Sequence, residues 1–130
     1  MTDILEQYQN GYDAVVEMLL IELDVPRAAM RASVVFRAVR VTRAREHWVR
    51  IQVRFSKLEV VRLGHEWLEG GGAILYDGGT LNWSEESATA VLNFDPGVAW
   101  RATGQQKPTE ASSALLSGSC EITIEEIPAE

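Results

Sequence analysis

A chain of 130 residues with 46% apolar content is long enough for one hydrophobic core and short for two, so a single domain over residues 1–130 is expected. Glu17, Glu22 and Asp24 interrupt the most apolar segment, which excludes a membrane helix of about 20 apolar residues. The acidic N-terminus has no basic region ahead of a long apolar run, so no signal peptide is recognised and a cytoplasmic protein is expected.

The net charge of −7 is unevenly distributed along the chain. Residues 1–25 hold six acids and no Lys or Arg, residues 27–62 hold ten bases and two acids, and residues 63–130 hold two bases and eleven acids. The basic segment has two interpretations: it pairs with acidic strands inside the fold, or it forms a binding surface. A sequence pI near 4.8 argues against nucleic acid as the partner.

The first predicted element is a short helix within residues 1–11. Asp3 is its expected cap, Glu6 occupies the capping-box position and Gly11 is the expected terminator. A long strand is predicted from Tyr12 to Val25, with apolar residues on both of its faces. The N-terminal helix is the segment expected to cover the second apolar face.

Period-two alternation and turn residues predict the remaining strands, at residues 30–42, 49–55, 58–63, 74–76, 80–83, 88–94, 98–103 and 120–127. A change of apolar parity near Ala38 and Val39 predicts a β-bulge there. Glycine-containing turns predict two hairpins, which join 74–76 to 80–83 and 88–94 to 98–103. Residues 104–118 lack periodicity and are expected to form a long surface loop. The fold class is therefore mostly β, an antiparallel sandwich or open barrel of about eight to nine strands.

Few residues are suited to catalysis or metal binding. His47 and His65 are the only imidazole bases, and no nucleophile motif accompanies them. His65, Glu66 and Glu69 do not have the spacing of a zinc-hydrolase helix, and the glycines that follow favour a solvated loop. The sequence predicts no enzyme, no metal site and no cofactor. Cys120 alternates with Ile122 and Ile124 and is expected to be buried.

A stripe of Trp and Arg residues is predicted on the polar face of the strand around residues 48–54. Trp48 shares the polar parity of its strand with Arg50 and Arg54, and Trp and Arg are enriched at interface hot spots. The same stripe could serve local packing through cation–π contacts, so both interpretations stay open. The candidate binding residues are Trp48, Arg50, Arg54, His65, Glu66 and Trp67.

The order of features resembles the immunity protein 50 family and related small bacterial β domains. The resemblance lies in Tyr12-Asp13-Ala14 at the entry to the first strand, in the run from Val49 to Phe55, and in the acidic alternating segment Glu121 to Ile127, and it covers residues 12–127. It implies a mostly β fold and a protein that binds and neutralises a toxin.

We therefore expect a non-enzymatic protein-binding module, and the resemblance implies an immunity-like inhibitor of a toxin or effector. The alternative is a small-ligand or carbohydrate-binding domain that uses Trp48, Trp67 or Trp83 as stacking platforms. A homodimer through an uncovered edge strand is compatible with either function.

Overall fold

The computed structural model describes residues 2–43, 45–63, 74–75, 78–94 and 114–128. It is mostly β, as expected, with one short helix. The elements in chain order are β1 (Thr2–Asp3), the 3-10 helix η1 (Ile4–Gly11), β2 (Ala14–Asp24), β3 (Ala29–Thr42), β4 (Arg45–Leu63), β5 (Ile74–Leu75), β6 (Thr80–Ser84), β7 (Thr89–Phe94) and β8 (Ala114–Glu126).

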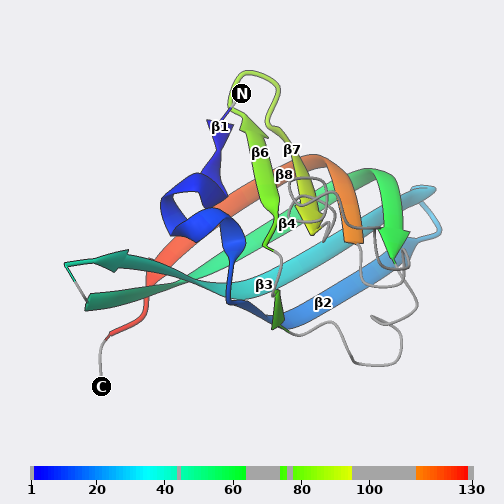
Figure 1. Ribbon diagram of the computed structural model, residues 1–130. Coiled ribbons are helices and arrows are strands. Elements are labelled where there is room, and N and C mark those ends of the chain that lie inside the picture. The colour runs from blue at the N-terminus through cyan, green and yellow to red at the C-terminus, as the bar shows by residue number, and fades with distance from the viewer. Residues whose placement is uncertain (1, 44, 64–73, 76–77, 95–113, 129–130) are drawn as a thin grey trace, which may run out of the picture.

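All the described strands belong to one antiparallel sheet in the order β1-β6-β7-β8-β4-β3-β2-β5 (Figure 1). The sheet is strongly curled, because β5 is its last strand and β6 is the second strand from the other end, although only residues 76–79 separate the two, a reach of at most ~18 Å. The two ends of the sheet are not paired with each other. A sandwich or open barrel of eight to nine strands is a finer description than this and stays a prediction.

The core lies inside the curl. Its largest fully buried side chains are Phe36, Phe55, Leu5, Ile51, Leu81, Leu92, Leu116, Val34 and Val53. The rings of Phe36 and Phe94 meet edge to face with centroids 5.6 Å apart, an arrangement that aromatic pairs favour. We call the sheet face that carries Phe36, Ile51 and Phe55 the inner face and the opposite one the outer face.

The predicted helix is confirmed, but it does not lie where the sequence suggested. Asp3 caps η1 as expected, since its Oδ1 accepts a hydrogen bond from the Leu5 N–H at 3.1 Å. η1 contacts β3 and β6 and buries Leu5 in the core. The expectation that it covers the second apolar face of β2 is wrong, because Met18 and Leu20 on that outer face are exposed.

The bulges differ from the predicted one. The pairing of β3 with β4 is unbroken from Ala32 to Thr42, so the expected bulge at Ala38 and Val39 is wrong. Val39 is buried on the outer face because it stands directly opposite Trp48. The register shifts instead at Glu17 in β2 and at Ser56 and Glu59 in β4.

Two predicted strands, 49–55 and 58–63, are one continuous strand, β4. The shifts at Ser56 and Glu59 change the apolar parity without ending the strand, which made one strand resemble two. Gly118 of β8 faces this irregular stretch, and a Cβ there would collide with the Lys57 carbonyl oxygen. Glycine therefore permits the close approach of β8 to β4 at this point.

The predicted hairpins are wrong. β5 pairs with β2 and not with β6, and residues 78 and 79 between them pack against Asn10 and Gly11 of η1. β7 pairs with β6 along one edge and with β8 along the other, while its predicted partner 98–103 lies outside the described residues. Of the predicted loop, 104–113 is likewise undescribed and 114–118 begins β8, where Ala114 and Leu116 are buried.

Candidate functional site

Trp48, Arg50 and Arg54 lie on the outer face of β4, as the alternation of the sequence predicts. The other three candidate residues, His65, Glu66 and Trp67, lie outside the described residues. The structure thus gives a geometry for half of the predicted binding surface.

Glu17 forms ion pairs with two arginines, Arg50 of β4 and Arg37 of the neighbouring strand β3. Its Oε1 lies 2.9 Å from Arg50 Nε and 3.8 Å from Arg37 Nε. Glu17 is the extra residue at the β2 bulge, which allows its carboxylate to reach over β3 to β4. The hydrogen bond from Arg50 and the negative charge of Glu17 raise the pKa of Arg50 above its ordinary value.

Trp48 also has neighbours of its own. Its Nε1 donates a hydrogen bond to Glu46 Oε2 at 3.2 Å, and the Arg37 guanidinium carbon lies 5.9 Å from the centroid of its ring. Trp83, a second tryptophan proposed for ligand stacking, is partly buried against the core. These contacts favour local packing as the role of Trp48 and Trp83.

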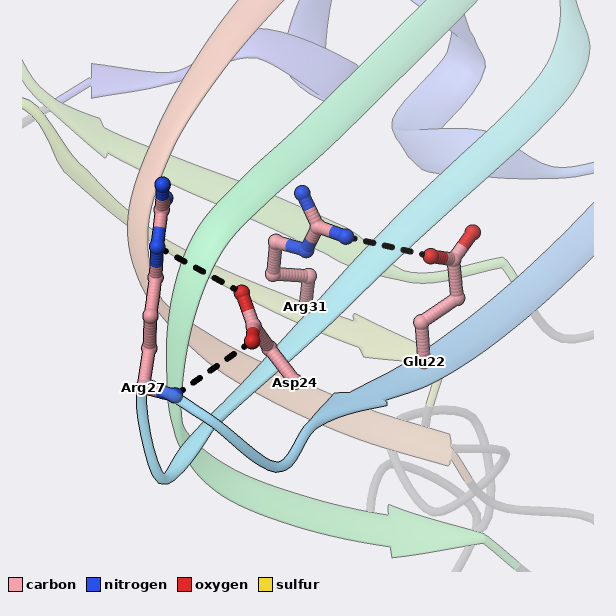
Figure 2. A network of polar contacts seen from close by, with 4 residues as sticks. All are labelled: Glu22, Asp24, Arg27 and Arg31. Carbon is pink, nitrogen blue, oxygen red and sulfur yellow. Dashed lines mark hydrogen bonds and ion pairs between the residues drawn. The ribbon is translucent and has the colours of Figure 1, made fainter.

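The segregated charge is explained by strand order. The basic strands β3 and β4 lie between β2 and β8, which carry acids. The register places Arg50 opposite Glu125 and Arg54 opposite Glu121. At the β2–β3 end, Arg31 Nη2 lies 3.3 Å from Glu22 Oε2 and Arg27 Nε lies 3.8 Å from Asp24 Oδ2 (Figure 2). Within the described residues, internal ion pairs therefore account for four of the ten bases of the segment: Arg27, Arg31, Arg37 and Arg50.

Arg54 is one of the six bases of this segment that have no ion pair in the described part of the chain. Although it stands opposite Glu121, no carboxylate among the described residues lies within 4.0 Å of its guanidinium. Both residues line a depression of about 550 Å³ that extends from β2 across β3 and β4 to β8. Sequence reasoning selected Arg54 but gave no indication of this depression.

The feature that the sequence reasoning missed is the edge of β2. β5 pairs with β2 only at Ala14 and Val15, so in the described part of the chain one edge of residues 16–24 has no strand beside it. The exposed apolar side chains of this edge and of the turn after it are Met18, Leu20, Leu23 and Val25. Met30 of β3, opposite Leu23, is exposed beside them. The signal was present as the apolar run from residue 18 to residue 21, but the sequence alone placed a helix over it.

Within the portion that the structure describes, no three or more His, Cys, Asp or Glu residues gather to hold a metal ion. None of the described helices is long and apolar enough to cross a membrane. Searches against protein-family models, curated proteins and solved structures found no match to this chain.

Proposed function

We propose that this protein is a non-enzymatic cytoplasmic module that binds another protein by pairing an extended segment of that partner with the open edge of β2. The observation that carries the proposal is the composition of β2. A strand that is apolar on both faces is typical of the interior of a sheet, whereas residues 16–24 of β2 have a described neighbour on one side only.

Strand addition needs free main-chain groups and side chains that an added strand can cover. An edge strand offers a row of N–H and C=O groups, and alternate side chains on its two faces supply selectivity. Met18 and Leu20 on the outer face are 40% and 45% exposed, and Leu23 on the other face is 65% exposed. Such a site requires complementary surface rather than reactive groups.

The acids of β2 do little to protect its edge. Charged side chains commonly prevent edge strands from pairing with foreign strands. Here Glu17 is joined to Arg50, Glu22 to Arg31 and Asp24 to Arg27, so each carboxylate is directed to an arginine of its own chain. The apolar run between Glu17 and Glu22 carries no charge of its own.

β4 also has a stretch of open edge among the described residues. Over residues 57–63 it also has a single described neighbour, β8. That stretch, however, is interrupted by Lys57, Glu59 and Arg62, the pattern by which natural edges avoid pairing. β2 is therefore the edge better suited to a partner.

The charge of the molecule indicates the kind of partner. With a net charge of −7, the protein attracts a basic protein over long range and repels a second copy of itself. A basic partner with an exposed apolar strand fits this edge better than self-association. The resemblance to immunity-like domains supports the further proposal that the partner is a toxin or effector that this protein inhibits.

The test compares two variants that make the same chemical change at different places. Met18→Lys places a charge on the β2 edge, and Val41→Lys makes the same change on the outer face of β3, at a position that is 48% exposed and beyond the pairing with β2. The protein and its variants are purified from the native cells, and stoichiometric partners are identified and titrated. We expect Met18→Lys to weaken partner binding at least about tenfold, a change of ~1.4 kcal/mol, and Val41→Lys to leave it unchanged.

Equal affinities of the two variants would overturn the proposed site, provided that both unfold at the wild-type temperature. Failure to find any partner that binds near micromolar affinity would overturn the function itself. A stable homodimer that Met18→Lys dissociates would assign the edge to a second copy of the chain, against the charge argument.

A further inference from the structure

The depression that Arg54 and Glu121 line lies away from the Glu17 cluster and uses different residues. Its lining combines outer-face side chains with Ala32, Phe55 and Cys120 of the inner face. One row of its lining is fixed by the register: Leu20 of β2 stands opposite Ser33 of β3, Ser33 opposite Arg54 of β4, and Arg54 opposite Glu121 of β8. Arg31 of β3 reaches toward Glu22 of β2 (Figure 2). Both residues line the same depression. The site thus spans four neighbouring strands.

Three serines line the depression. Ser33, Ser56 and Ser119 lie among the larger residues of the lining, and Ser56 occupies the β4 irregularity where its Oγ donates a hydrogen bond to the Ser119 carbonyl oxygen. The hollow of about 550 Å³ falls within the range of ~300–1,000 Å³ that small-molecule sites occupy. Three hydroxyl groups and an apolar end at Leu20 make its surface amphipathic.

The charges of the lining balance. Arg31 and Arg54 are matched in number by Glu22 and Glu121, so the site favours neither a simple anion nor a simple cation. Arg31 is already joined to Glu22 at 3.3 Å. Arg54 and Glu121 stand opposite each other, yet neither has an ion pair within 4.0 Å among the residues that the structure describes. One donor group and one acceptor group therefore face the hollow.

We propose that this depression binds a small zwitterion of dipeptide size with an apolar side chain. Its carboxylate binds Arg54, its ammonium group binds Glu121, and its apolar side chain passes over Ser33 toward Leu20. Neighbouring strands are ~4.8 Å apart, and the two Cα atoms of a dipeptide are ~3.8 Å apart, so its termini can reach adjacent strands. A guanidinium–carboxylate contact supplies a charge-assisted hydrogen bond at one end of the ligand.

Isothermal titration with alanyl-leucine, its N-acetyl derivative and its C-terminal amide tests the proposal. We expect alanyl-leucine to bind and each capped derivative to bind at least about tenfold more weakly, because each loses one charge-assisted contact. Arg54→Gln and Glu121→Gln should each reduce the affinity for alanyl-leucine by a similar factor. Arg27→Gln is the matched control, since Arg27 lies in the turn after β2 and outside the lining, and it should leave the affinity unchanged.

Absence of heat for alanyl-leucine at millimolar concentration, or equal binding of the capped and uncapped peptides, would overturn the proposal. Met18 does not line the depression, so Met18→Lys should retain dipeptide binding. The outcome for this site is therefore separate from the outcome for protein binding at the β2 edge.

Discussion

Cys120 illustrates how far a single residue can be predicted. It is the only cysteine, and its alternation with Ile122 correctly places it in the core, where it is 5% exposed. Burial raises the pKa of its thiol from 9.0 to about 11. Parity does not predict every neighbour, since Ile124 shares the face of Cys120 but is exposed near the end of β8.

The Cys120 pKa predicts how stability changes at high pH. The unfolded thiol ionises near its ordinary pKa of 9.0, whereas the folded thiol retains its proton up to about 11. The stabilisation from this group is therefore complete below pH 9 and is lost as the pH rises to 11. Urea unfolding of the wild type and of Cys120→Ala should show a steeper loss of stability in the wild type across this interval. Parallel pH curves for the two proteins would contradict the burial of the thiol.

Among the elements, η1 shows which contacts a local pattern can and cannot reveal. The cap at Asp3 was predictable because it involves neighbouring residues in the sequence. Its second contact was not, because Asp3 Oδ1 also accepts a hydrogen bond from the N–H of Leu81, 2.9 Å away and 78 residues later. One carboxylate oxygen thus fixes both the start of η1 and its attachment to β6.

This double role gives Asp3→Ala a measurable cost. Loss of a helix cap and of a second hydrogen bond should lower the free energy of unfolding by about 1–2 kcal/mol. Glu6→Ala is the matched control, since Glu6 is an exposed acid of the same helix, and it should change the stability by less than about 0.5 kcal/mol. Chemical denaturation of both variants checks this, and similar losses for the two would contradict the role of Asp3.

β2 and β4 explain the remaining differences at the scale of elements. Their alternation predicted strands at 12–25, 49–55 and 58–63, where the structure has β2 at 14–24 and a single strand, β4, at 45–63, because a bulge changes parity much as a chain break does. The sequence therefore divided β4 into two strands and placed a bulge at Val39. The burial of Val39 depends on Trp48 of the neighbouring strand, a contact that no local pattern contains.

At the scale of the whole molecule, charge was more informative than turns. The acidic, basic and acidic blocks of the sequence correctly predicted that β3 and β4 lie beside acidic strands. The predicted turn between β5 and β6 did not identify a pairing partner, because β5 pairs with β2 whereas β6 pairs with β1 and β7. The second predicted turn lies outside the described residues. The candidate site arose from this topology: the strand with the most apolar run became an edge, with only β5 beside part of it.

Hydrogen exchange of the free protein, followed residue by residue by NMR, tests the central claim that residues 16–24 of β2 form an open edge. The amides of Val34 in β3 and Val53 in β4 should exchange slowly, because both strands are paired on both sides at these residues. Along β2, alternate amides should exchange at least about 100-fold faster than these, because every second N–H points away from β3. Uniformly slow exchange from residue 16 to residue 24 would show that the edge is already covered and would contradict the account.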